Sequence, residues 1–296
     1  MLNPQNKLLR HPERIAEWLR TGRTRPILIE VDPTGYCNAT CDWCFYNGQK
    51  TGVNINSKHL LKAIKKMKPL AVNWTGGGEP TLHPHFNYMT QEVAKMGIEQ
   101  GLFTNCLKDM GVNPKLFKWI RVSLTNTYFK GMDTDLLRYY ADQTKTGVVL
   151  NLTPENAMYA DLMCRQARDL GVAYFQVRPA LNRRGVTNIE IPDLKHLETD
   201  NFRVFLTEYK FDDAQRPHSY DKCYGYHFCP VIDYNGDVRA CNYHFDRYAF
   251  GNISDMKLTI PDHVAVCDDC QVCCKNHEIN KVLFALSQEQ EDENFI

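Results

Sequence analysis

Residues 36–46 read YCNATCDWCFY and space three cysteines, Cys37, Cys41 and Cys44, as C-x3-C-x2-C. Three thiolates can bind three irons of a cubane cluster and leave the fourth iron without a protein ligand. Substrate or cofactor chemistry needs such an open metal position, whereas a site closed by four ligands serves structure or electron transfer. The spacing therefore favours a catalytic iron–sulfur centre. The alternative is a structural zinc ion that takes its fourth ligand from elsewhere in the chain.

The cysteine stretch directly follows the first of six apolar segments of strand length, and helical patterns separate these segments. We expect strands at 27–31, 71–75, 101–104, 120–125, 147–153 and 172–179, and helices at 11–20, 57–68, 86–97, 114–118, 133–145 and 155–170. Ser57 is a good N-cap for the second of these helices. The alternation predicts parallel crossovers and a curved parallel sheet, although an open doubly wound sheet would give the same pattern. In such architectures the chemistry lies at the carboxyl ends of the strands.

A second signal follows the next expected strand, where residues 75–80 read TGGGEP. Glycines at a strand end allow the backbone to approach a ligand closely. The carboxylate of Glu79 can accept a hydrogen bond from an ammonium group. A glycine run alone is common in turns, but here it comes at the strand end that follows the cysteine loop.

These two motifs, with the aromatic Trp43 before the last cysteine, resemble the radical S-adenosylmethionine superfamily over about residues 25–190. The resemblance implies a [4Fe–4S] cluster on the three cysteines of the loop. It further implies that the open iron chelates S-adenosylmethionine, which is cleaved reductively to a 5′-deoxyadenosyl radical. The family pattern assigns the methionine amino group to Gly77, Gly78 and Glu79, and a ribose contact to Ser123. Weaker polar matches at later strand ends are Thr104, Asn105, Asn151, Gln176 and Arg178.

Seven more cysteines lie in two stretches, CYGYHFCPVIDYNGDVRAC at 223–241 and CDDCQVCC at 267–274. The NGD at 235–237 is a hairpin signal. A cysteine before a hairpin, one at its end and a following C-x2-C pair resemble the extensions called twitch and SPASM domains, which hold an auxiliary [4Fe–4S] cluster. Seven thiols cannot fully ligate two cubanes, so we expect one such cluster. The expected ligands are Cys223, Cys241, Cys267 and Cys270, with Cys229, Cys273 and Cys274 as competitors; bound zinc is the alternative.

A cysteine that the auxiliary cluster does not use could donate a hydrogen atom to a substrate radical, and Cys229 is our candidate for this catalytic role. Cys106 and Cys164 stand in ordinary strand-end and helix contexts, so we expect them to be buried small hydrophobes.

The expected fold class is α/β, a partial parallel (β/α)6 barrel with a small cysteine-rich C-terminal extension. The expected divisions are an N-terminal helix at 1–24, the barrel at 25–207, the extension at 208–280 and an acidic tail at 281–296. Basic and acidic residues balance at 35 each, which removes the usual electrostatic argument for binding duplex nucleic acid. Apolar runs stay well short of the roughly 18 residues of a membrane span, and residues 1–20 lack a signal peptide. We therefore expect a cytoplasmic protein.

The residues and the resemblance together predict a radical S-adenosylmethionine enzyme, an oxidoreductase or isomerase supplied with electrons by a partner such as flavodoxin or ferredoxin. Few residues flank the barrel and the last cysteine, which favours a small-molecule substrate (a sugar, a nucleoside or another metabolite) or a short peptide. The alternative within the class is a peptide-modifying maturase. A zinc-stabilised binding module would not explain the glycine run, and a ferredoxin-like protein would need no barrel.

Overall fold

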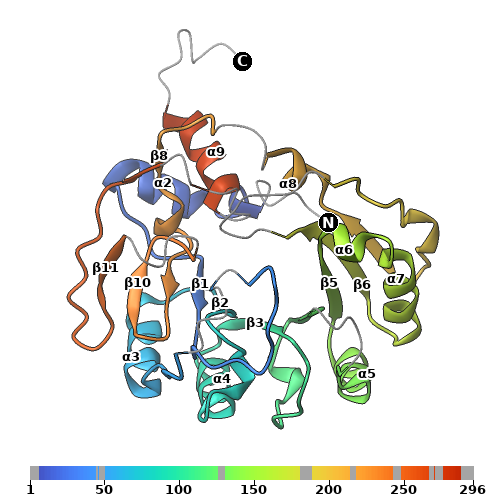
Figure 1. The fold of residues 1–296 in the computed structure, drawn as a ribbon. Helices are drawn as coiled ribbons and strands as arrows, with labels where there is room; N and C mark the ends of the chain where they lie inside the picture. Colours follow the sequence, from blue (N-terminus) through green and yellow to red (C-terminus); the bar gives the residue numbers. More distant parts are fainter. Residues whose placement is uncertain are drawn as a thin grey trace.

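A curved and largely parallel sheet forms the centre of this computed structural model (Figure 1). The structure describes residues 7–44, 46, 51–125, 131–180, 189–213, 218–242, 248–266, 270 and 276–287. Ten strands follow the order β11-β10-β9-β1-β2-β3-β4-β5-β6-β7. The parallel strands from β1 onward are β1 (Leu28–Val31), β2 (Ala71–Trp74), β3 (Glu99–Thr104), β4 (Trp119–Ser123), β5 (Thr146–Leu152), β6 (Tyr174–Pro179) and β7 (Arg203–Leu206). The six expected strands and the α/β class are confirmed, and β7 is a seventh strand that the sequence reading missed.

The helices that connect the strands are α3 (Ser57–Met67), α4 (Phe86–Lys95), α5 (Thr134–Gln143), α6 (Pro154–Ala157) and α7 (Ala160–Asp169), with α2 (Pro12–Thr21) before the sheet. Asn56, and not Ser57, caps α3, because its side-chain oxygen accepts from the backbone N–H groups of Lys58 and His59. The helix expected at 114–118 is only a three-residue 3-10 turn that Pro114 begins. Residues 155–170 form two helices, α6 and α7, rather than one.

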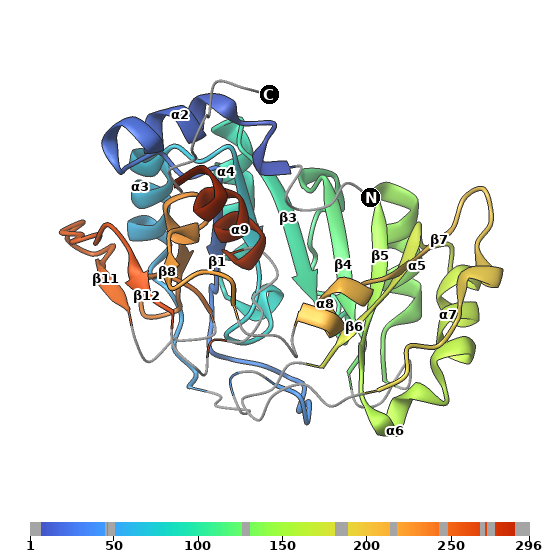
Figure 2. The same ribbon diagram turned by 90° about the horizontal axis from the view of Figure 1, so that it is seen from above.

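The two faces of the sheet differ in chemistry. One face packs against α3, α4, α5 and α7 in a single hydrophobic core. This core contains Val31, Trp74, Leu102, Ile120, Val148 and Phe175. Alternate residues point to the opposite, inner face. Register places Glu30 beside Asn73 and Val149 beside Gln176 there, and Arg121 and Arg178 lie on the same face. The helices therefore cover the apolar face, and the polar side chains line the inside of the arc. Figure 2 shows the course of the strands and helices from above.

The C-terminal segment extends this same sheet rather than standing apart from it. Strand β9 (Val231–Ile232) pairs in parallel with β1, and β10 (Asp237–Arg239) and β11 (Ala249–Asn252) continue outward in antiparallel order. Gly236 takes a φ of 84° in the turn between β9 and β10, so the expected hairpin is confirmed. A separate pair, β8 (Lys222–Cys223) and β12 (Val264–Ala265), and helix α9 (Asn276–Ser287) lie beside it. Helix α8 (Glu208–Asp213) follows β7. Among the described helices, none combines the length and the apolar character needed to cross a bilayer.

Candidate functional site

The first cysteine loop leaves β1 and lies on the ends of its neighbours. Thr34 forms bridges to Gly77 on one side and to Asn54 on the other. The carbonyl of Tyr36 accepts a hydrogen bond from the Glu79 N–H at 2.8 Å. Within the loop the Cys44 N–H donates to the Cys41 carbonyl at 2.9 Å, a turn that fixes the C-x2-C pair. The loop is therefore held at the carboxyl ends of β1 and β2, where the parallel sheet predicts chemistry.

The glycine run makes this contact possible. A Cβ on Gly78 would lie 2.0 Å from the Tyr36 carbonyl oxygen, and one on Gly77 would lie 2.9 Å from the Thr34 carbonyl oxygen. Gly77 also has a φ of 83°, which side-chain-bearing residues rarely adopt. In this structure the backbone that approaches the glycines is thus that of the cysteine loop itself.

Glu79 is only 3% exposed, and its carboxylate joins two strand ends. One oxygen accepts from the Thr81 N–H, the Thr81 hydroxyl and the Thr104 hydroxyl at 3.2, 2.8 and 2.8 Å, and the other accepts from the Asn105 N–H at 2.7 Å. Burial raises the pKa of Glu79, and these donors oppose the rise by favouring the ionised form. The residue that we expected to receive an ammonium group already accepts four hydrogen bonds from its own chain.

Asn105, at the end of β3, extends the same contacts to the first cysteine. Its side-chain amide donates to the Asn38 side-chain oxygen at 2.8 Å, and its nitrogen lies 4.0 Å from the Cys37 sulfur. Glu79, Asn105 and the cysteine loop thus form one connected group across the ends of β1, β2 and β3.

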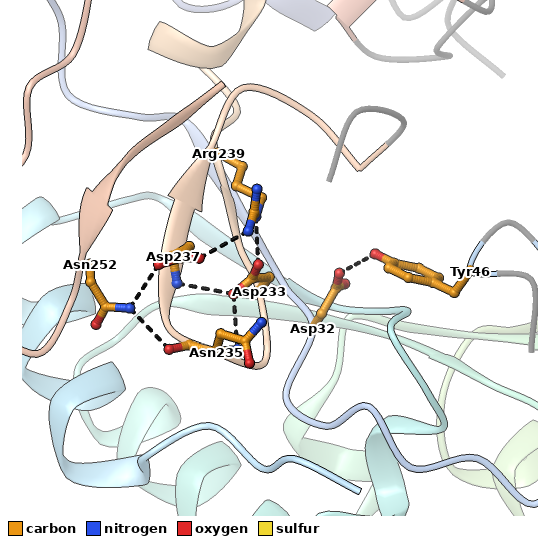
Figure 3. Close-up of polar contacts among 7 residues, drawn as sticks. All are labelled: Asp32, Tyr46, Asp233, Asn235, Asp237, Arg239 and Asn252. Atoms are coloured by element: carbon orange, nitrogen blue, oxygen red, sulfur yellow. Dashed lines mark hydrogen bonds and ion pairs between the residues drawn. The ribbon is translucent and has the colours of Figure 1, made fainter. Parts of the chain in front are cut away.

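Asp32 precedes the cysteine loop and Tyr46 follows it, and a hydrogen bond joins their side chains (Figure 3). Neither residue was expected from the sequence to belong to the site. Asp32 follows β1 and is fully buried. One of its oxygens accepts a short hydrogen bond from the Tyr46 hydroxyl, and the other accepts none from the described residues. Burial raises the pKa of Asp32 to about 8, with the charges of Glu30 and Asp233 adding to the rise. An acid directly after an apolar strand was the available sequence signal.

Beside Asp32, the β9–β10 hairpin carries its own polar network (Figure 3). Asp233 accepts from the backbone N–H groups of Asn235 and Asp237 at 2.9 and 3.0 Å and pairs with Arg239 at 2.5 Å. Arg239 also pairs with Asp237 at 2.9 Å, and Asn252 of β11 donates to Asp237 at 2.8 Å. These contacts fix the shape of the hairpin and join it to β11, because each side chain in the network bonds to a neighbouring strand or turn.

The other expected contact residues lie on the inner face of β4, β5 and β6. Ser123 is half-buried at the end of β4. Arg178 donates to Asn151 at 2.6 Å across β6 and β5. Gln176 is 4% exposed, and its side-chain oxygen accepts no hydrogen bond from the described residues. This wall therefore presents hydroxyl, amide and guanidinium groups to the inside of the arc, on strands that adjoin those of the cysteine loop.

Cys229 and Cys241, two members of the second group of cysteines, lie at the amino end of β1, opposite the first cysteine loop. The backbone carbonyl of Phe228 accepts from Leu28 N–H, so Cys229 lies at the start of β1 and β9. Cys241 follows β10, which runs antiparallel to β9 and so returns to that end. The four residues of β1 span about 13 Å from its amino end to its carboxyl end, at about 3.3 Å per residue. Cys267, Cys273 and Cys274 lie outside the described residues.

The described thiols differ in their surroundings. Cys106 and Cys164 are 1% and 0% exposed, so the expectation that both are buried is confirmed. Cys229 is 4% exposed. Burial raises the pKa of the Cys223 thiol, and a hydrogen bond from Asn280 acts in the opposite sense. Within the described residues, no three His, Cys, Asp or Glu side chains converge closely enough to hold a metal ion. Cluster ligation by each named cysteine stays a prediction.

Comparison with known proteins identifies the fold. No family model matches the chain. It is 33% identical over 82 residues to the tungsten-containing aldehyde ferredoxin oxidoreductase cofactor-modifying protein of Pyrococcus furiosus, a match over 26% of this chain and 23% of that relative.

Streptococcus suis SuiB bound to S-adenosylmethionine superposes with a TM-score of 0.57 at 17% identity, over 88% of this chain and 71% of SuiB. The protein anSMEcpe, with AdoMet and a peptide bound, gives a TM-score of 0.58 at 18% identity, over 88% and 84%. SuiB with its precursor peptide SuiA gives 0.56 at 17% identity, over 88% and 70%.

This chain shares its fold with SuiB and anSMEcpe, which were solved with S-adenosylmethionine or AdoMet bound. The three thiols of the first loop lie together at the strand ends, and they are the number and type of donors that would hold a [4Fe–4S] cluster with one iron open. In this fold the polar groups of β4, β5 and β6 face the inside of the arc rather than the helices.

Proposed function

We propose that this chain is a radical S-adenosylmethionine enzyme that abstracts a hydrogen atom from its substrate. The observation that carries the proposal is the cysteine loop of 37–44, which the glycine run and the Glu79 network hold at the ends of β1, β2 and β3 in this fold. A [4Fe–4S] cluster on Cys37, Cys41 and Cys44 would supply the electron that cleaves S-adenosylmethionine.

The chain's own residues then have binding and positioning roles. The backbone of Gly77 and Gly78 lies against the cysteine loop and would receive the methionine amino group of the cofactor. Glu79 fixes the ends of β2 and β3 through its four hydrogen bonds, so the same strand end is rigid when the cofactor arrives. Ser123, half-buried at the end of β4, would contact the ribose. A low-potential electron donor such as flavodoxin or ferredoxin would reduce the cluster.

An auxiliary [4Fe–4S] cluster would lie at the other edge of the sheet. Its proposed ligands are Cys223, Cys241, Cys267 and Cys270. The proposal is supported by topology, because the segments before β9 and after β10 return to one edge. The polar inner face of the arc then lies between the two iron–sulfur sites, which is where a substrate would have access to both.

The proposed substrate is a small molecule such as a sugar, a nucleoside or another metabolite, with oxidation, epimerisation or rearrangement as the outcome. The amide, hydroxyl and guanidinium groups of β4 to β6 suit a polar compound of this kind. A peptide substrate is the second candidate, because SuiB and anSMEcpe, which share the fold, were each solved with a peptide bound. Product analysis with extracts fractionated by size distinguishes the two, since only a peptide product would be sensitive to protease treatment.

Cleavage of the cofactor tests the function without a known substrate. Anaerobically reconstituted protein with a strong reductant should convert S-adenosylmethionine to 5′-deoxyadenosine and methionine. Chromatography of the reaction measures both products, and a sample without reductant is the control. No 5′-deoxyadenosine above that control would refute the assignment.

Iron content tests the two-cluster proposal. Reconstituted protein should hold about eight iron atoms, four for each cubane. Replacing Cys37, Cys41 and Cys44 together by Ala should remove about half of the iron and all cofactor cleavage. Complete loss of iron in this triple variant, or no loss, would show that two independent clusters are not present.

Cys229 is proposed as a hydrogen-atom donor to the substrate radical, with ligation of the auxiliary cluster as its competing role. If Cys229 is the donor, Cys229→Ala should keep its iron and still form 5′-deoxyadenosine, but it should form no product. If Cys229 is a ligand, the same variant should instead lose iron of the auxiliary cluster or change the electron paramagnetic resonance signal of that cluster. A variant with normal iron and normal product would leave Cys229 as a buried structural thiol.

A further inference from the structure

Helix α9 buries polar side chains along its first two turns. Asn276, His277, Glu278 and Asn280 are each 6% exposed or less. Burial of polar groups costs free energy unless they find hydrogen-bond partners. The start of α9 therefore lies against polar parts of the protein, and its asparagines bond to the cysteine-rich segments at β8 and after β10 (Figures 1 and 2).

The orientation of the Asn280 amide is fixed by its neighbours. Its oxygen accepts from the backbone N–H groups of Tyr224 and Gly225 at 2.7 and 2.9 Å. Because both of these partners can only donate, the oxygen must occupy that side of the amide and the NH2 group must occupy the other. The NH2 group then points at the sulfur of Cys223, 3.1 Å away.

We infer that Asn280 tunes the reduction potential of the auxiliary cluster by donating a hydrogen bond to the Cys223 sulfur. The inference rests on the proposed function, in which Cys223 is a ligand of that cluster. Hydrogen bonds to the sulfurs of an iron–sulfur cluster are one of the levers that set its potential. A donor stabilises the extra negative charge of the reduced state, so Asn280 raises the potential.

Other contacts place the same helix beside two more of the proposed ligands. Asn276 donates to the carbonyl of Ala240, the residue before Cys241, at 2.8 Å. The ring of His218 contacts the Cys270 carbonyl at 3.1 Å, and that ring packs on His277 of α9 with centroids 5.2 Å apart. Asn280 differs from these residues because it reaches a sulfur atom directly, whereas they contact the backbone or a neighbouring ring.

Asn280→Asp separates the two roles of the side chain. It keeps an oxygen for the two backbone donors and removes the NH2 donor to sulfur. Asn276→Asp is the matched control, because it adds the same charge one turn earlier on α9 and leaves the donor to sulfur in place. Both are made in the holoprotein that carries the triple Cys37, Cys41 and Cys44 to Ala replacement, so that only the auxiliary cluster contributes to the signal.

A redox titration followed by electron paramagnetic resonance gives the result. Asn280→Asp should keep the iron content of its parent and lower the reduced-to-oxidised ratio at a fixed ambient potential at least tenfold, which is 59 mV for one electron. Asn276→Asp should shift the ratio much less. An unchanged potential in Asn280→Asp, or an equal shift in the control, would overturn the inference.

A neutral variant covers the case in which Asn280→Asp does not take up iron. Asn280→Leu removes the donor without adding charge, and its potential should also fall; a potential at or above that of the parent would overturn the inference. A triple variant without iron would refute the auxiliary cluster itself, and the inference with it. That result differs from an iron-loaded protein whose potential ignores Asn280, which would leave the proposed function intact.

Discussion

Replacing the buried carboxyl of Asp32 by an amide should change how the stability of the protein depends on pH. Burial raises the pKa of Asp32 from its usual 3.8 to about 8 in the folded protein. The folded state thus holds this proton more tightly than the unfolded chain does. The free energy of unfolding therefore falls as the pH rises from about 4 towards 8, because the unfolded chain ionises first. Asp32→Asn cannot ionise and loses this pH dependence.

The magnitude follows from the width of that interval. Each pH unit between the two pKa values is worth 1.36 kcal/mol, so the contribution of Asp32 changes by about 4 kcal/mol between pH 5 and pH 8. The new NH2 group replaces an oxygen that accepts no hydrogen bond from the described residues, and its cost is the same at every pH. Relative to its parent, Asp32→Asn should therefore gain about 4 kcal/mol in its free energy of unfolding between pH 5 and pH 8.

Urea denaturation of both reconstituted proteins at the two pH values measures this difference under anaerobic conditions. All other titrating groups are common to the two chains, so their contributions cancel. Asp142→Asn, at an exposed position on α5, is the control and should show no such shift. A difference between Asp32→Asn and its parent that stays constant from pH 5 to pH 8 would refute the reasoning.

Three further changes test the packing of the site. Gly78→Ala should destabilise the fold by about 3 kcal/mol or more and reduce iron uptake, because its Cβ would lie 2.0 Å from the Tyr36 carbonyl oxygen; thermal denaturation and iron analysis measure this, and normal stability would contradict the close approach. Tyr46→Phe should cost about 1–3 kcal/mol in urea denaturation, because it removes the donor to the carboxyl at the end of β1; an unchanged unfolding midpoint would argue against that hydrogen bond. Glu79→Gln should cost about 2 kcal/mol in the same assay, because an NH2 group replaces the oxygen that accepts from the Asn105 N–H; a cost below about 0.5 kcal/mol would show that the charge is not needed there.

Much of the fold was readable from the sequence because its signals are local. Six strands alternate with helical patterns, and each strand was expected within a few residues of its observed bounds. The turn at 235–237 was also predicted, since Asn-Gly sequences favour it wherever they stand. The 3-10 turn at 114–116 and the break between α6 and α7 were missed, because periodicity alone does not distinguish a single turn from a longer helix.

The partners of short strands came only from the tertiary structure. Strand β9 has two residues and carries no periodic pattern, yet it pairs in parallel with β1 and brings the cysteine-rich segment to the edge of the main sheet. Its position depends on the hydrogen-bonding groups that β1 leaves open, which the local sequence of β9 does not encode. The same reason explains why β7 was missed, since it adds to the other edge of the sheet.

The site divides in the same way. The sequence by itself determined which residue types meet at the strand ends: the three cysteines of the first loop, the glycine run and Glu79. Only the tertiary structure decided what each one contacts. Glu79 accepts four hydrogen bonds from its own chain, Asp32 receives the Tyr46 hydroxyl, and Asn280 reaches Cys223 across 57 positions of sequence. Spacing predicts chemistry within a loop, whereas burial and hydrogen-bond partners depend on segments that folding alone brings together.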